Sequence, residues 1–281
     1  HPSRRNIEYP CCCTSELTTE SETGLAVQIS MVRTFQPNIR RAKSIVRGEL
    51  DIIEAERVAF QRFLKRLDDL ETSPPPDFDA SATPTTPLLT GPRPESDYVA
   101  TVRTAYAETV MEAPHYSEEY NDSVDDSIAE EFGESTAEIL RQNERLSEYI
   151  LRIFVDKARY SLTNRGNFVS TLQRELESLE ESELDLNEVE NAAQKIYESI
   201  YESEKDRKKS QRLRCLEQRC ERVASRRQRL IHNRSTRAMS GVDTESLLEY
   251  LYDELEVQCP VLADVSGCLR TIRAARERVS E

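Results

Sequence analysis

The residues with the richest chemistry lie between Pro114 and Tyr120. This heptapeptide holds His115, two tyrosines and two adjacent glutamates. A histidine beside a carboxylate and a phenol can transfer protons, so His115, Glu118 and Tyr120 are candidates for an acid–base site. The same residues also suit a turn between helices whose tyrosine rings pack on neighbouring helices, and we favour this second interpretation.

Four of the seven cysteines could in principle supply thiolates to a zinc ion: Cys215, Cys220, Cys259 and Cys268. Structural zinc sites usually take their thiolates in pairs two to four residues apart. Cys215 and Cys220 are five residues apart, which is about 140° around a helix. The spacing therefore favours free, at least half-buried thiols. We predict no metal and no cofactor.

The third candidate is a concentration of positive charge in an acidic chain. Residues 205–237 carry 13 Lys/Arg and three Asp/Glu, whereas the whole chain has a formal net charge of −14. Residues 108–138 carry 11 acidic and no basic side chains, so the two segments could neutralise each other within one chain or between subunits. The candidate binding residues are arginines of the basic segment: Arg212, Arg214, Arg219, Arg222, Arg226, Arg227 and Arg229.

Two kinds of partner suit such a segment. A nucleic acid would bind it as a polyanion, but binding to phosphates falls steeply with salt. The basic segment also has no Phe, Tyr or Trp on which bases could stack. We therefore predict a protein partner or self-association, with residues 108–138 lying against the basic segment. A nucleic-acid-associated regulator is the alternative.

The composition indicates a salt-rich cytoplasm. Acidic residues are in excess, and most of the 38 basic residues are Arg rather than Lys, as in proteins of salt-accumulating halophiles. An acidic coiled coil from a GC-rich genome would look similar. We find no phosphate-binding glycine loop, no evident small-molecule site and no apolar run of the roughly 20 residues that cross a bilayer. The expected protein is cytoplasmic, not membrane-bound and not an enzyme.

The apolar pattern predicts an all-α protein, a long antiparallel helical hairpin or coiled-coil bundle with short accessory helices. Long helices are expected at about 37–71, 144–183 and 186–232. Asp185 with Glu188 three residues later is a capping-box arrangement, so the turn of the hairpin is predicted near residue 184.

The predicted organisation has six segments. They are a disordered or non-native upstream extension (1–30), a long N-terminal helix (31–71), a Pro-rich linker (72–95), short acidic helices (96–142), the long helical hairpin (143–234) and a C-terminal helical pair (235–281).

Three stretches of the sequence have a pattern in common with a known family. They are TVMEAPHYSEEY at 109–120, LYDELEV at 251–257 followed by PVLA, and RRA at 40–42 with EAER at 54–57 and Phe60. In these stretches the chain resembles an uncharacterised haloarchaeal family, a domain of unknown function, over about residues 31–280. The resemblance implies an all-helical haloarchaeal protein and no particular activity. We therefore expect a non-enzymatic helical scaffold or partner-binding protein.

Overall fold

The computed structural model describes residues 36–72, 98–120, 122–142, 148–199, 206–235 and 244–280. These residues form helices and their connections, without a strand, so the predicted all-α class and helical bundle are confirmed, while coiled-coil supercoiling stays a prediction. The helices are α1 (Pro37–Thr72), α2 (Tyr98–Ala107), α3 (Tyr116–Glu119), α4 (Val124–Phe132), α5 (Glu134–Gln142), α6 (Glu148–Glu198), α7 (Asp206–Ser235), α8 (Thr244–Tyr252) and α9 (Pro260–Ser280). None of these described helices combines the length and apolarity that crossing a membrane requires. The predicted upstream extension and all but the first residue of the predicted Pro-rich linker lie outside the described residues.

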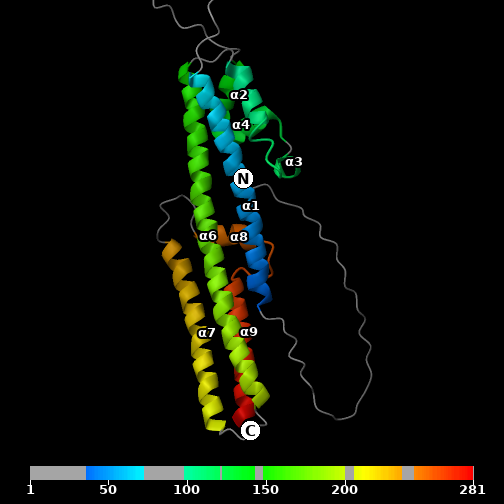
Figure 1. The fold of residues 1–281 in the computed structure, drawn as a ribbon, viewed down its shortest axis with the longest axis vertical. Coiled ribbons are helices and arrows are strands. Elements are labelled where there is room, and N and C mark those ends of the chain that lie inside the picture. The colour runs from blue at the N-terminus through cyan, green and yellow to red at the C-terminus, as the bar shows by residue number, and fades with distance from the viewer. Residues whose placement is uncertain are drawn as a thin grey trace, which may run out of the picture.

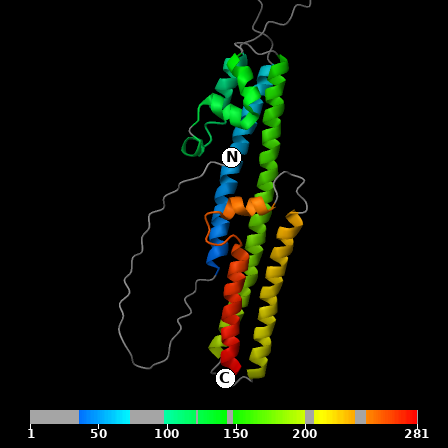
Figure 2. The same cartoon turned by 180° about the vertical axis from the view of Figure 1, so that it is seen from behind.

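Helices α1 and α6 form the spine of the molecule and run antiparallel, side by side (Figures 1 and 2). The direction follows from the ion pairs between them. Near the start of α1, Lys43 Nζ lies 2.6 Å from Glu183, late in α6, and near the end of α1, Asp68 lies 3.4 Å from Arg159, early in α6. Apolar residues of α1 at helical spacing are fully buried along this contact, among them Ile39, Val46, Phe60 and Leu67.

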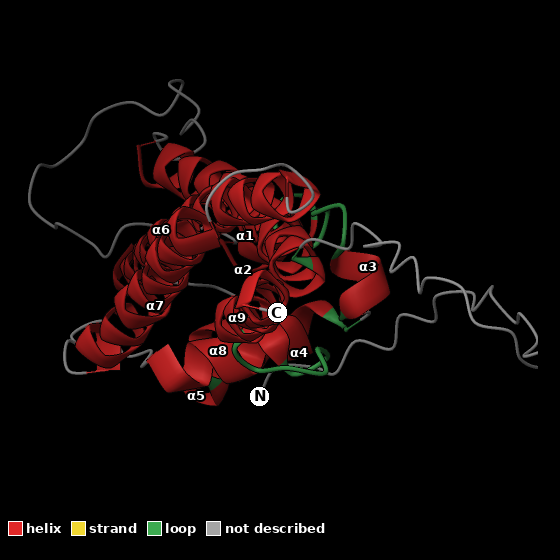
Figure 3. Ribbon diagram, turned by 90° about the horizontal axis from the view of Figure 1, so that it is seen from below, coloured by secondary structure: helices red, strands yellow, loops and turns green. Residues whose placement is uncertain are grey.

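Among the described residues, the spine carries two large apolar cores and one small apolar cluster of Ala59, Ala113 and Tyr116. The first core joins the second half of α1 and the first half of α6 to α2, α4 and α5. At its centre the Phe132 ring has four aromatic neighbours with centroids 5.9–6.3 Å away: Phe60, Phe63, Tyr106 and Phe154. The second core joins the other halves of the spine to α7, α8 and α9. The end-on view of Figure 3 shows helices around the spine, joined in places by loops and turns. The short acidic helices and the basic helix α7 therefore belong to different ends of the molecule.

The start of α1 is held by α9. Pro37 is the first residue of α1, a position where its missing N–H costs no helical hydrogen bond. Asp264 of α9 accepts a hydrogen bond from the Ile39 backbone N–H at 2.8 Å and another from the Asn38 side chain at 2.6 Å. This carboxylate satisfies a backbone donor that the helix cannot satisfy itself. The same carboxylate joins the start of α1 to α9.

The predicted turn near residue 184 is wrong. Helix α6 continues without interruption through Leu184 and Asp185 to Glu198. The capping-box pattern fails because Leu179, Leu186 and Val189 continue one buried stripe through the acidic run. Their burial stabilises helix on both sides of Asp185, and a local capping preference of about 1 kcal/mol cannot compete with it.

The chain reverses between Glu198 and Asp206 instead. Lys209, buried in the first turn of α7, donates from Nζ to the Ser199 carbonyl at 2.6 Å and so supplies a donor just beyond the end of α6. Because the turn is later than predicted, α7 packs against the second half of α6. Residues 175–190 of that part hold eight acidic and no basic side chains.

Within one chain, the prediction that residues 108–138 lie against the basic helix is also wrong, whereas pairing between subunits stays a prediction. This segment packs at the end of the spine where α1 finishes and α6 begins, whereas α7 packs at the opposite end (Figures 1 and 2). Its carboxylates pair locally: Glu108 with Arg66, Asp125 with Arg103 and Glu131 with Arg165. The position of the hairpin turn is the cause, because it gives α7 an acidic neighbour on α6.

Candidate interaction face on helix α7

Helix α7 is amphipathic, and its apolar stripe determines which of its arginines face solvent. Four side chains at steps of three and four residues are buried against α6 and α9: Leu213, Leu216, Cys220 and Val223. Glu217, beside the stripe, accepts hydrogen bonds from Arg273 at 2.9 Å and Arg276 at 2.8 Å, both on α9. The arginines of α7 therefore divide between the edges of the stripe and the outer face.

Of the seven predicted arginines, Arg227 alone is buried, with 2% of its surface exposed. Its two terminal nitrogens donate to the two carboxylate oxygens of Glu175 on α6 at 3.0 and 2.5 Å. Tyr252 of α8 donates to the same carboxylate at 2.7 Å. Burial opposes the charge on Arg227, but the bonds to Glu175 raise its pKa. Burial and the Glu175 charge also raise the pKa of Tyr252. This arginine holds the fold and is not available to a partner.

Arg219 and Arg226 lie at the edge of the stripe and are half-buried. Arg219 donates to Glu188 at 2.6 Å, and Arg226 lies 2.6 Å from Asp185 and 3.1 Å from Glu181. All three carboxylates belong to α6. These two arginines therefore fasten α7 to α6 as well.

The other four predicted residues, Arg212, Arg214, Arg222 and Arg229, are exposed, and we name them the outer arginines. Among the residues that the structure describes, no carboxylate forms an ion pair with any of them. Arg229 donates from Nε to the Ser225 carbonyl of its own helix at 3.2 Å. The predicted site thus separates into three arginines that hold the fold and four that present positive charge to solvent.

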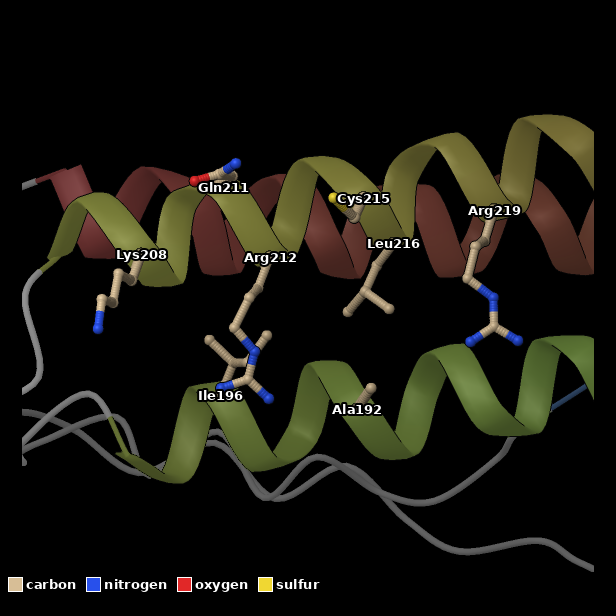
Figure 4. Close-up of a pocket in the computed structure, with 8 residues that line it drawn as sticks. All are labelled: Ala192, Ile196, Lys208, Gln211, Arg212, Cys215, Leu216 and Arg219. Carbon is tan, nitrogen blue, oxygen red and sulfur yellow. The ribbon is translucent and has the colours of Figure 1, made fainter.

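A groove lies between the end of α6 and the start of α7, and Arg212, one of the outer arginines, lines it (Figure 4). Its volume is about 530 Å³, and we name it the α6–α7 groove. Ala192, Ile196 and Leu216 give it an apolar floor, and none of its described lining residues is acidic. Lys208 and Arg212 supply its positive charge, and Arg219, which is paired with Glu188, also lines it. The groove can accept an apolar side chain and carboxylates together.

Part of the predicted acid–base site does come together at the other end of the molecule. His115 Nε2 lies 3.2 Å from Glu56 of α1, and Tyr120 donates to the same carboxylate oxygen at 3.4 Å. Arg165 of α6 donates to the second oxygen at 2.8 Å. Burial would raise the pKa of Glu56, but the hydrogen bond from His115 and the charge of Arg165 hold it below its usual value. The Glu118 side chain lies outside what the structure describes.

The structure brings together two of the four candidate cysteines. Cys220 of α7 and Cys268 of α9 are buried, and their sulfur atoms are 3.4 Å apart. Cys215 is exposed and Cys259 is half-buried. The hydrogen bond between Cys220 and Cys268 lowers the pKa of Cys220 and, with burial, raises the pKa of Cys268. Across the described residues, no three His, Cys, Asp or Glu side chains are grouped closely enough to hold a metal ion.

The sequence reasoning missed the carboxylates of α6 that neutralise the inner edge of α7. The available signal was the acidic run at 175–190. A turn near residue 184 would divide that run between two helices, so the position of the turn, rather than composition, decides which charges meet.

Comparison with curated proteins and with solved structures gave no match. The model of a protein family described as a domain of unknown function, DUF7260, matches residues 37–276, from the first residue of α1 into the last turns of α9. The predicted membership of an uncharacterised helical family is confirmed, and the haloarchaeal origin stays a prediction. The chain belongs to the DUF7260 family.

Proposed function

We propose that this chain is a non-enzymatic helical scaffold that binds an acidic protein surface through the outer arginines and the α6–α7 groove. The observation that carries the proposal is the division of the arginines on α7. Arg219, Arg226 and Arg227 are neutralised by α6, whereas the outer arginines have no described carboxylate partner. The chain has a net charge of −14, yet this helix presents positive charge to solvent. That charge complements an acidic surface on another molecule.

The groove supports a protein partner over a nucleic acid. An apolar side chain of the partner would desolvate Ile196 and Leu216. Arg212 and Lys208 line the same groove and could form ion pairs with the partner's carboxylates. An amphipathic helix with acidic flanks presents both groups together. A phosphate backbone would use the arginines alone. A nucleic-acid-associated regulator acting through the same outer arginines is the alternative, but α7 has no Phe, Tyr or Trp on which bases could stack.

A second copy of the chain is one source of such an acidic surface. Residues 108–138 are acidic and lie at the end of the molecule opposite α7 (Figure 1). A contact between these ends would join two different surfaces. Contacts of that kind produce rings or open chains rather than a two-fold dimer. Self-association would therefore grow with protein concentration.

On composition, we further propose that the protein works in a salt-rich cytoplasm. At molar salt the Debye length is about 3 Å, so charges act only in direct contact. The apolar floor of the groove would then supply binding energy that salt does not screen. Binding should weaken with added KCl and level off rather than vanish.

A charge-reversal experiment tests the proposal. The outer variant is Arg212→Glu/Arg214→Glu/Arg222→Glu/Arg229→Glu. The matched control reverses four exposed basic residues on other helices, Arg41→Glu/Arg62→Glu/Lys65→Glu/Lys157→Glu, which changes the net charge equally. The probes are a fluorescent acidic amphipathic helical peptide, a peptide with the sequence of residues 108–142, and a DNA duplex, each titrated at low and molar KCl. Light scattering on the purified protein measures self-association.

We expect both peptides to bind wild type and the control, and the outer variant to bind at least tenfold more weakly. Equal peptide binding by the outer variant and the control would contradict the proposal. Binding of DNA without peptide binding, lost only in the outer variant, would establish the alternative.

A further inference from the structure

A second cavity lies at the acidic end of the spine, and the proposed scaffold role does not use it. It is lined by residues of α1, α2, α4, α6 and the turns around α3, in the region where α2, α3 and α4 gather in Figure 1. Its volume is about 360 Å³, within the range of about 300–1,000 Å³ that is typical of small-molecule sites. Four aromatic rings line it: Phe60, Tyr106, Tyr116 and Tyr120.

The positive charge in this cavity is already neutralised. Arg165 donates from both terminal nitrogens to Glu131 at 2.8 and 2.9 Å, and from Nε to Glu56 at 2.8 Å. Its guanidinium carbon lies 4.1 Å from the centroid of the Phe60 ring. Two carboxylates and a ring therefore hold this arginine in place.

Two further carboxylates line the cavity without such a partner. Asp122 is half-buried and Glu130 is exposed. Among the described residues, neither meets a basic side chain. Among the described lining residues there are thus four carboxylates, those of Glu56, Asp122, Glu130 and Glu131, against the guanidinium of Arg165. This excess of negative charge matches a cationic ligand.

Tyr116, one of the lining residues, has a buried hydroxyl without a hydrogen bond of ordinary geometry. Only 8% of the residue's surface is exposed. The neighbouring Ser127 hydroxyl is bonded to Tyr106 at 3.0 Å. Burial and the charges of Asp122, Glu130 and Glu131 raise the pKa of Tyr116, although Ser127 acts in the opposite direction. Tyr116 is therefore a neutral phenol, and buried phenols normally have a hydrogen-bond partner.

We propose that this cavity binds a small organic ammonium ion that carries at least one N–H. The N–H donates to the Tyr116 hydroxyl oxygen, and Asp122 and Glu130 balance the charge. The rings of Tyr116 and Tyr120, with centroids 5.2 Å apart, contact the carbon atoms and attract the cation through their faces. Aromatic walls suit an organic cation better than a metal ion, which requires closely grouped oxygen, nitrogen or sulfur ligands.

The experiment uses three probes that separate charge from shape. n-Butylammonium has both the charge and the N–H, tetramethylammonium has charge without N–H, and n-butanol has a similar shape without charge. Each is titrated into the full chain at constant ionic strength, and binding is followed by calorimetry and by NMR shifts of the tyrosine rings. The variants are Tyr116→Phe and Asp122→Asn/Glu130→Gln. The control is Tyr160→Phe. It removes the hydroxyl of a tyrosine on α6 that is 67% exposed and does not line the cavity.

We expect saturable binding of n-butylammonium to wild type and to the Tyr160→Phe control. Tyr116→Phe should bind n-butylammonium about tenfold more weakly and tetramethylammonium unchanged, because only the first loses a hydrogen bond to a charged donor. The double variant should weaken both cations. Tyr116→Phe removes an unbonded hydroxyl and keeps the ring, so its thermal midpoint should not fall below that of wild type.

Three results would overturn the proposal. They are the absence of saturable n-butylammonium binding to the folded wild-type chain, equal binding of n-butanol and n-butylammonium, and unchanged n-butylammonium binding by Tyr116→Phe. None of these bears on the outer arginines of α7, which lie at the opposite end of the molecule.

Discussion

Arg227 and Glu175 form a buried ion pair across the contact between α7 and α6, with nitrogen–oxygen distances of 2.5 and 3.0 Å. Tyr252 joins it from α8, so one carboxylate serves three helices. A shift of α7 by one turn would leave a buried charge without its partner. The pair therefore fixes the register of the hairpin, a role for which buried polar groups are known.

Removing one partner of this pair should destabilise the fold strongly. We expect Arg227→Met to lower the free energy of unfolding by about 3–5 kcal/mol, because the Glu175 carboxylate stays buried without its partner. The double variant Arg227→Met/Glu175→Leu should recover much of the loss. Urea unfolding of the single and double variants measures the coupling as a double-mutant cycle.

The control for this prediction is Arg222→Met on the same helix, where the side chain is exposed. It should change the free energy of unfolding by no more than about 0.5 kcal/mol. A similar small change for Arg227→Met would show that the buried pair does not hold the hairpin.

The contact that joins α1, α6 and α9 should make stability depend on pH. Gln36, just before α1, donates to Glu190 of α6 at 3.2 Å. Burial, with a contribution from the Asp264 charge, raises the pKa of Glu190 to about 7, and burial also raises the pKa of Asp264. A carboxyl whose pKa is higher in the folded state stabilises the fold when it is protonated. Its contribution is complete below pH 4.5 and is lost as the pH rises toward about 7.

We therefore expect Glu190→Gln to remove a pH dependence that wild type shows between about pH 4.5 and 7.5. Wild type should lose about 1–2 kcal/mol relative to this variant over the interval, after allowance for the solvent that still reaches Glu190. Glu56 and Glu183 have lowered pKa values, so they change protonation below this interval and do not contribute to the pH dependence measured within it. Urea midpoints measured across it give the difference. Glu177→Gln, an exposed change on α6, should track wild type, and parallel curves for Glu190→Gln and wild type would exclude the effect.

The sequence allowed the fold class and most helices to be predicted, because apolar spacing reports directly which face of a helix is buried. Ile39, Val46 and Leu67 on α1 are examples, and all three are fully buried. The turn of the hairpin could not be placed in the same way. Asp185 and Glu188 satisfy a local capping pattern, but Leu186 and Val189 are buried against helices that are distant in sequence, and this packing decides.

The candidate site was predictable only in part for the same reason. Charge counting identified the arginines of α7, but Arg227 and Arg222 look alike in sequence. What distinguishes them is the position of Glu175, 52 residues before Arg227, and that position follows from the turn. The cavity at Tyr116 has still less signal, since Asp122, Glu130 and Tyr106 come from separate elements and share no spacing.

The thiols of Cys220 and Cys268 should form a disulfide when the protein is refolded with oxidised glutathione. Thiolate exchange with glutathione disulfide forms a mixed disulfide, and the second thiol then displaces reduced glutathione. The two thiols are adjacent at 3.4 Å, whereas Cys215 is exposed and should stop at the mixed disulfide. Mass spectrometry of proteolytic fragments identifies each product. A preference for Cys215–Cys259 linkage would contradict the native contact of α7 with α9.

Deleting the central ring of the first core should loosen one end of the molecule and leave the other intact. Phe132 contacts four rings there. Phe132→Ala should therefore lower the free energy of unfolding by about 3–5 kcal/mol, through lost burial and the cavity left behind. The second core shares only the spine with the first. The amide hydrogens of α7 and α9 should therefore keep their protection from exchange, while those of α2, α4 and α5 lose theirs.

The reciprocal variant, Leu213→Ala in the second core, should increase exchange of the amide hydrogens of α7 and α9 and leave those of α4 protected. Equal loss of protection at both ends in either variant would mean that the two cores unfold as one unit, because the spine formed by α1 and α6 would then transmit the whole disruption.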